Sequence, residues 1–250
     1  MSVCRLLKTS ALKVVLGVAI PLAGRAQFTQ SNLAYNMASN FNNGYGVVPN
    51  SYQLLAADGS LIQGRYSLWP AWTPASILLL GNQQAIAAPL KYDIYRQELR
   101  VQRPQGDSVI VPLSKVQEFT VKLAAQERRF VCYPAAQLPP GAGGGCGEVL
   151  GGGPALQLVK FWRRVAVRRY QRNGSYASNV VENQLEEQAQ YFLHWADTKF
   201  SPVRLRRSSL VEALAGQPAA LQLLAGYKGS LTTEEGMAAA VKQIAALISN

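Results

Sequence analysis

Alternating apolar and polar residues at 89–123 constrain the fold of this chain more than any other stretch. Leu99 and Val101 alternate with charged or amide residues, and the same alternation returns around Val121. A two-residue period puts the apolar side chains of a strand on one face and the polar ones on the other. The connector at 103–107, Arg-Pro-Gln-Gly-Asp, carries turn residues between two such runs. The stretch therefore predicts an antiparallel β-meander.

Further strands are expected on both sides of the meander. They cover residues 65–69, 75–80, 86–94, 128–132, 156–172, 190–195 and 200–205. The continuous apolar run at 75–80 predicts a strand that is covered on both faces. The run at 156–172 fits a strand or a helix by period, but its β-branched valines and the following Asn173-Gly174 hairpin signal favour a strand.

The last 45 residues change in character. Short helices are expected at 210–214 and 219–224, and a longer last helix is expected after a capping box formed by Thr232 and Glu235. The predicted fold class is therefore α+β: an antiparallel β-meander that forms a sandwich or half-barrel, with a short C-terminal helical tail. The β body would span 27–205 with a Gly/Pro-rich loop at 134–154, and the tail at 206–250 would pack on it.

The first 26 residues have the pattern of a cleaved secretory signal peptide. Basic residues come first, an apolar run covers 14–22 within an uncharged run at 14–24, and small residues precede a cut after Ala26. The uncharged run is shorter than the roughly 20 residues that a spanning helix needs. The pattern predicts export to the periplasm or to the extracellular space; an uncleaved anchor or a buried helix is the alternative.

Removal of this segment takes away four basic residues and no acidic one, so the net charge falls from +11 to +7. A basic exported protein can bind anionic envelope components, such as lipid head groups or polysaccharide. Arginines interleaved with aromatics at 156–172 also fit nucleic-acid contacts, but no nucleic acid is expected outside the cell. A plain solvated strand face is the other alternative. The candidate contact surface consists of Lys160, Trp162, Arg164, Arg168 and Tyr170.

Two cysteines, Cys132 and Cys146, remain after the predicted cleavage. In an oxidising compartment they could pair and close the segment 133–145 into a loop, or remain as two thiols. Their spacing leaves both options open.

Most common catalytic chemistries lack the residues they need. A single histidine, His194, excludes a multi-histidine zinc site, and it is expected to be a partly buried structural residue. Neither a GxSxG elbow nor a P-loop is present, and no cofactor is expected. A pair of carboxylates could still serve a glycan or ester hydrolase. Strand faces or turns account for each candidate acid: Asp93, Glu98, Glu118, Glu148, Glu182, Glu186, Glu187 and Asp197.

Several runs carry a resemblance to a known group. They are LKYDIYRQELRVQ, VPLSKVQEFTV, RRFV, LQLVKF and LRRSSLVEAL, followed by a capped last helix. In these runs the chain resembles exported proteins of unknown function that are common in the Bacteroidota. The resemblance implies a bacterial envelope or secreted protein, and it implies no activity, cofactor or site residue. The Gly-rich segment at 139–153 is longer than in that pattern.

The sequence thus predicts a non-catalytic exported binding or structural protein associated with the envelope. Two alternatives stay open. One is a lipid or small-molecule carrier, in which the sheet encloses a ligand beside Trp69, Trp72 and Tyr92. The other is the carboxylate-based hydrolase.

Overall fold

The structure is a computed structural model that describes residues 62–124, 126–142, 144–171, 180–197 and 199–249. The predicted signal peptide and the Asn173-Gly174 turn lie outside the described residues. The strands are β1 (Ile62–Gln63), β2 (Thr73–Leu79), β3 (Ile86–Asp93), β4 (Glu98–Gln102), β5 (Ser108–Val111), β6 (Val116–Leu123), β7 (Gln126–Cys132), β8 (Cys146–Gly152), β9 (Leu156–Gln171), β10 (Val180–Trp195) and β11 (Phe200–Val203). The helices are α2 (Arg207–Ala213), α3 (Pro218–Gly226) and α4 (Glu234–Ile248), with short 3₁₀ turns η1 (Leu113–Lys115) and η2 (Ala135–Gln137).

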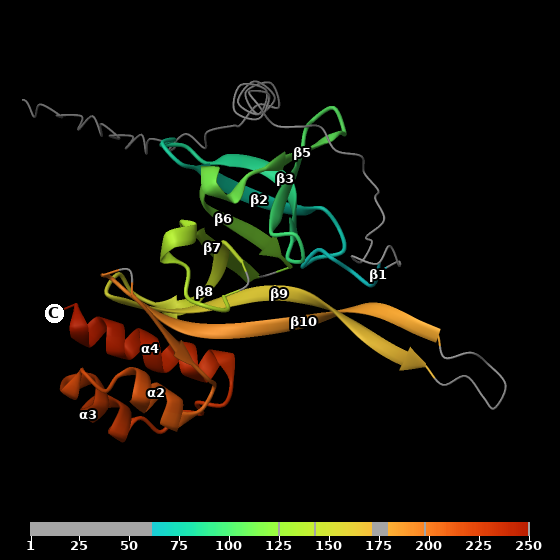
Figure 1. Ribbon diagram of the computed structural model, residues 1–250. Coiled ribbons are helices and arrows are strands. Elements are labelled where there is room, and N and C mark those ends of the chain that lie inside the picture. The colour runs from blue at the N-terminus through green and yellow to red at the C-terminus, as the bar shows by residue number, and fades with distance from the viewer. Residues whose placement is uncertain (1–61, 125, 143, 172–179, 198, 250) are drawn as a thin grey trace, which may run out of the picture.

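The described strands form one sheet, in the order β1-β10-β9-β8-β7-β6-β2-β3-β4-β5, and β11 also pairs with β10. All pairs between these strands are antiparallel except β1 with β10. Figure 1 shows β2 to β7 in one part of the molecule, and the helices on the opposite side of β9 and β10. The β-rich architecture with helices near the C-terminus is therefore confirmed.

The β2–β7 region buries one apolar core. Its alternating residues supply the inner face as predicted: Tyr92, Phe119 and Phe130 are fully buried and lie in ring contact with one another. Trp69 adds an edge-to-face contact with Phe130, with ring centroids 5.6 Å apart. Aromatic groups of this size dominate the energetics of a core, so this cluster holds the meander together.

One strand prediction is wrong in its burial. The apolar run at 75–80 is covered on one face only, because Ile77 and Leu79 are buried while Ser76 is exposed and Leu80 is 57% exposed. β2 is an interior strand between β6 and β3, so its backbone is paired on both edges. Pairing on both edges does not require cover on both faces, and a short apolar run does not distinguish the two arrangements.

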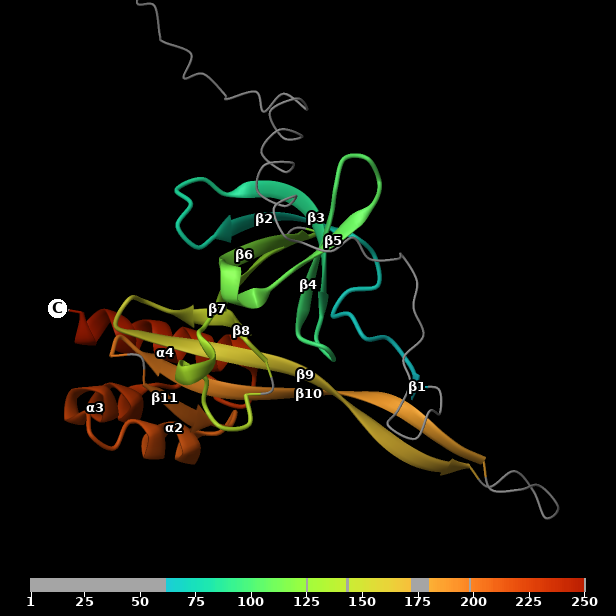
Figure 2. The ribbon, with the colours of Figure 1, turned by 45° about the horizontal axis from the view of Figure 1, so that its top comes forward.

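The long β9–β10 hairpin connects the two parts of the molecule. Its register is continuous from Gln171 opposite Val180 to Leu156 opposite Trp195. In Figures 1 and 2 one end of the hairpin lies over the helices and the other extends away from them. β9 confirms the strand predicted at 156–172, whereas β10 begins ten residues before the predicted strand at 190–195. Residues 183–188 contain one apolar residue, Leu185, so the sequence there has no alternation to detect.

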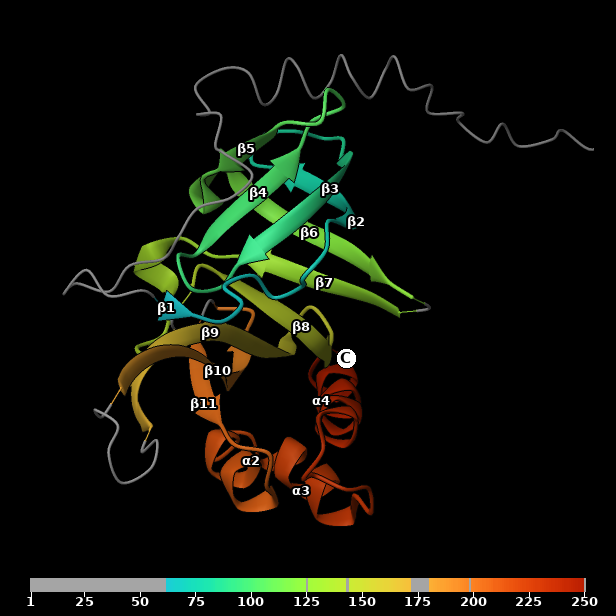
Figure 3. The ribbon, with the colours of Figure 1, turned by 90° about the vertical axis from the view of Figure 1, so that its right-hand side faces the viewer.

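A second core lies between the hairpin and the helices. Leu156, Leu158 and Leu193 face α2, α3 and α4, which form the lowest layer in Figure 3. α4 buries the face that its 3.6-residue period predicts: Met237, Val241, Ile244 and Ala245. The helical tail is thus held by apolar packing against the end of β9 and β10. No helix in the described ranges has the length and apolar character needed to cross a membrane.

The last helix begins one residue later than its predicted cap. Thr233, not Thr232, is the N-cap, and its side chain accepts a hydrogen bond from the backbone N–H of Gly236. Thr232 instead lies within 3.0 Å of Ser230 through the two hydroxyls. The shift places Glu234 at the first position of α4, where it meets a residue of β9 described below.

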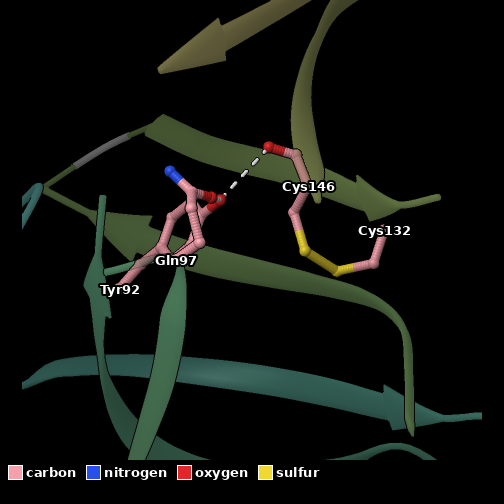
Figure 4. Close-up of a disulfide and its surroundings, with 4 residues drawn as sticks. All are labelled: Tyr92, Gln97, Cys132 and Cys146. Atoms are coloured by element: carbon pink, nitrogen blue, oxygen red, sulfur yellow. Dashed lines mark hydrogen bonds between the residues drawn. A yellow bond between two sulfur atoms is a disulfide. The ribbon is translucent and has the colours of Figure 1, made fainter. Parts of the chain in front are cut away.

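The predicted Gly/Pro-rich loop at 134–154 contains η2 and the interior strand β8. A disulfide joins Cys132 at the end of β7 to Cys146 at the start of β8, where the two residues lie directly opposite each other (Figure 4). The hydroxyl of Tyr92 donates to the carbonyl of Cys146 at 3.4 Å, so the cross-link also meets the aromatic core. Of the two options that the sequence left open, the structure contains the bonded pair.

We expect that replacing both cysteines, Cys132→Ser with Cys146→Ser, lowers the free energy of unfolding by about 3 kcal/mol, because the bond closes a loop in the unfolded chain. The loop spans a separation of 14 residues. Denaturant unfolding of the oxidised wild type, the reduced wild type and the variant measures the effect. The reduced wild type and the variant should agree; a midpoint unchanged in both would contradict a stabilising role for the bond.

Candidate functional site

A row of polar residues crosses the sheet between the two cores. Glu148 of β8, Lys160 of β9 and Tyr191 of β10 are successive cross-strand partners, so their side chains share one face. Along β9, Leu158 belongs to the second core, between the hairpin and the helices (the helical core), and Trp162 packs against the core of the β2–β7 region. Lys160 therefore lies where the two cores meet. We call this cluster the seam; it comprises Arg128, Glu148, Lys160, Trp162, Tyr191 and Glu234.

The first half of the seam is centred on Glu148. Arg128 donates two hydrogen bonds to its two carboxylate oxygens, each at 2.6 Å, and the indole Nε1 of Trp162 donates to Oε2 at 2.7 Å. Such a bidentate pair is among the stronger hydrogen-bonded arrangements in proteins. The guanidinium of Arg128 also lies 5.6 Å from the centroid of the Trp162 ring. The charge of Glu148 is thus neutralised where it is buried.

The second half joins the sheet to α4. Lys160 Nζ donates to Glu234 Oε1 at 2.5 Å, and the hydroxyl of Tyr191 donates to the same oxygen at 2.6 Å. Lys160 Nζ also lies 3.6 Å from the centroid of the Trp162 ring, within cation–π range. A cleft of about 570 Å³ opens over these groups. Because each charge of the seam already has an opposite charge, the seam is a closed network.

The same contacts shift the pKa values of the seam. Burial acts to raise the pKa of Glu234, but the hydrogen bonds from Lys160 and Tyr191 outweigh it, and the pKa lies below the ordinary carboxyl value of 4.5. Burial, followed by the hydrogen bond to Glu234, raises the pKa of the Tyr191 hydroxyl. Glu234 is therefore ionised and Tyr191 is protonated at neutral pH.

The five residues of the predicted anionic contact surface do not lie together on an exposed face. Lys160 and Arg164 are only 6% and 8% exposed, and Arg164 donates to Glu187 of β10 at 2.6 Å. Trp162 is half-buried and Arg168 is exposed, while only the backbone of Tyr170 is described. Lys160 and Arg164 can be buried because carboxylates of α4 and β10 lie opposite them. The period of a strand does not show which residues of neighbouring elements face it, so the sequence did not predict this burial.

A separate groove of about 1270 Å³ lies beside β11. It runs between the edge of β10, β11, α2 and the Pro139–Pro140 segment. Three of its lining residues are exposed cations, Lys199, Arg204 and Arg206, and within the described chain none of their side chains has a carboxylate partner. Its one lining acid is Glu212. The groove therefore presents a net positive, concave surface.

These cations were not predicted as site residues from the sequence. They stand in a run, KFSPVRLRR at 199–207, which continues without an acidic residue to Glu212. That absence of acids was an available signal. The run at 199–207 was predicted to form the last strand and the start of a helix. The three cations come together in space because β11 turns into α2 beside the edge of β10.

His194 lies near the groove in an aromatic environment. Its ring is stacked on Phe200 with centroids 4.4 Å apart, and the Tyr133 ring meets it edge-on at 5.0 Å. Burial lowers the pKa of His194, partly opposed by Asp197, and burial raises the pKa of Tyr133 to about 12. Both rings are thus neutral at pH 7. Among the described residues no group of three or more His, Cys, Asp or Glu side chains is placed to hold a metal ion.

Comparison with protein-family profiles, with curated proteins and with solved structures gives no match for the chain.

We expect Glu234→Gln to lower the free energy of unfolding at pH 7 by about 2 kcal/mol, because it leaves Lys160 buried without its opposite charge. The folded pKa of Glu234 is lowered, so its contribution is fully present above the ordinary carboxyl pKa and is lost as the pH falls through the lowered value. The difference between wild type and variant should therefore shrink in acid.

Denaturant unfolding between pH 7 and pH 3 measures this difference. Glu235→Gln is the matched control, because Glu235 is exposed and adjacent, and it should change little at any pH. A difference for Glu234→Gln that does not depend on pH would mean that the ion pair contributes nothing to stability.

Proposed function

We propose that this chain is a non-catalytic exported binding protein that holds an anionic ligand of the bacterial envelope in the groove beside β11. One observation carries the proposal: Lys199, Arg204 and Arg206 line a concave groove without a carboxylate partner in the described part of the chain. Elsewhere, Arg128, Lys160 and Arg164 are each paired with a glutamate. Unpaired cations gathered in one groove attract anions more than cations neutralised within the protein do.

The shape of the groove favours a chain-like ligand. Its volume of about 1270 Å³ exceeds the usual range for a small-molecule pocket, about 300–1,000 Å³. Phe200, Pro139 and Pro140 add apolar surface beside the cations. A chain that carries carboxylate, sulfate or phosphate groups can follow such a groove, whereas the flat surface of a bilayer reaches only its rim.

The state of the acidic residues supports a binding role. A carboxylate-based hydrolase needs one carboxyl group to donate a proton and a second to attack or to activate water. Glu148 and Glu234 are buried or half-buried acids that line the smaller cleft, and both accept hydrogen bonds from cations and aromatic side chains. The low pKa of Glu234 makes it a poor proton donor.

The β body acts in this proposal as a scaffold. We propose that β2 to β7 form a half-barrel whose interior is filled by its own aromatic residues, including Tyr92 and Phe119, which are fully buried. Filling of this kind favours a scaffold over a lipid carrier that holds its ligand inside the sheet. The signal-peptide pattern, the resemblance to exported Bacteroidota proteins and the Cys132–Cys146 bond support export, since disulfides persist in oxidising compartments.

The groove assignment predicts that a triple variant, Lys199→Ser, Arg204→Ser and Arg206→Ser, binds dextran sulfate about tenfold more weakly than wild type. The matched control removes three exposed lysines away from the groove, Lys115→Ser, Lys228→Ser and Lys242→Ser. It has the same net charge and should bind within about threefold of wild type. Titration calorimetry at two salt concentrations measures both variants.

An equal loss in the two variants would show that net charge alone drives binding, and the groove assignment would then be wrong. A second arm uses phosphatidylcholine vesicles that contain phosphatidylglycerol. Because a bilayer reaches only the rim of the groove, we expect vesicle binding to be similar in the groove variant and the control variant.

A further inference from the structure

The edge of β10 beside the groove carries backbone groups without a strand partner. β1 pairs with β10 at Asn183 and Gln184, and β11 pairs with it at Tyr191 to His194. Between them, residues 187–190 of β10 have a strand partner, β9, on one side only, as far as the structure describes the chain. Ala189 and Gln190, at the end of this interval, line the groove.

The register shows which residues direct their backbone groups to the open side. The N–H of Ala196 donates to the carbonyl of Ala155, across the β9–β10 pair, at 3.1 Å. The N–H of Trp195 donates to the carbonyl of Lys199, on the β11 side, at 2.9 Å. In an antiparallel ladder these directions alternate, and the β9–β10 register runs without a shift. Glu187 and Ala189 therefore direct their N–H and C=O groups to the open edge.

We propose that an extended acidic peptide of a partner protein adds to β10 at this edge, in line with β11, and places its carboxylates against the groove cations. Exposed N–H and C=O groups in a row are the template for strand addition, and the adjoining groove supplies room for side chains. Lys199, Arg204 and Arg206 set the charge of the partner. The inference rests on the proposed anion-binding groove and names the class of its ligand.

A second copy of this chain suits the edge less well. The open interval of β10 is short and is bounded by β1 and β11, whereas β10 of a second copy would continue past both of its ends and overlap those strands. The cations of both grooves would also remain without acidic partners. A separate acidic segment meets both requirements.

The test uses a fluorescein-labelled peptide of three aspartates followed by three Thr-Val repeats, and the same peptide with alternate backbone nitrogens methylated. A peptide that runs antiparallel to β10, as β11 does, then has its aspartates at the groove end. Both probes have the same charge, but the methylated one lacks hydrogen-bond donors on one edge. Fluorescence anisotropy should show about tenfold weaker binding of the methylated probe, because two backbone hydrogen bonds are lost.

Ala189→Pro tests the protein side of the contact. The N–H of Ala189 points away from β9, so proline removes no hydrogen bond of the β9–β10 pair. This variant should bind the unmethylated probe about tenfold more weakly than wild type does. Ala189→Ser keeps the N–H and should bind as wild type, and circular dichroism verifies the fold of both variants.

Amide hydrogen exchange gives a readout that does not depend on a variant. In the free protein the amides of Glu187 and Ala189 should exchange faster than those of Gln188 and Gln190, and the bound probe should protect the faster pair. Equal binding of both peptides would overturn strand addition while the anion-binding groove stands. Equal dextran sulfate binding by the triple groove variant and its matched control would refute the groove itself. A dimer that Ala189→Pro converts to a monomer would assign the edge to a second copy and overturn the peptide proposal.

Discussion

The structure depends on how one buried lysine is neutralised. Lys160 lies midway along the inner part of β9, with the core of the β body on one side and the helical core on the other. An unpaired charge at that depth is strongly unfavourable, so a carboxylate must come to it. Glu234 at the start of α4 supplies it, and Tyr191 donates to the same oxygen. The two hydrogen bonds to Glu234 are directional, so they add a constraint on the position of α4 to that of apolar packing.

The periodicity of apolar side chains predicted those features that are set within one strand or one helix. It predicted the meander, the strand nature of β9 and the buried face of α4, because each follows from which residues share a face. It failed where the answer depends on a neighbouring element. The burial of Lys160 and Arg164 is set by carboxylates on α4 and β10, and the outer part of β10 has no apolar alternation because little core lies against it. The groove was missed for the same reason, since its cations come together only in three dimensions.

The two edges of the β9–β10 hairpin are treated differently. Next to β8, the turn after β3 covers the outer edge of β9 at two residues: the N–H of Arg164 donates to the carbonyl of Ile94, and the side chain of Gln97 donates to the carbonyl of Trp162. Natural sheets usually protect their edges in this way, because exposed edges pair with other chains. The hairpin thus has an edge on β9 that its own chain covers at Trp162 and Arg164, and an edge on β10 with an interval that a partner strand can reach.

The cross-link between β7 and β8 has a consequence for the groove. Cys132 and Cys146 bracket the segment that contains Pro139 and Pro140, and these two prolines form one wall of the groove. Oxidation therefore tethers that wall at both of its ends. If the chain is exported as proposed, it leaves a reducing cytoplasm with the wall untethered and acquires the tether on arrival. The groove would then be completed only in an oxidising compartment, and it would not be complete while the chain is exposed to intracellular polyanions.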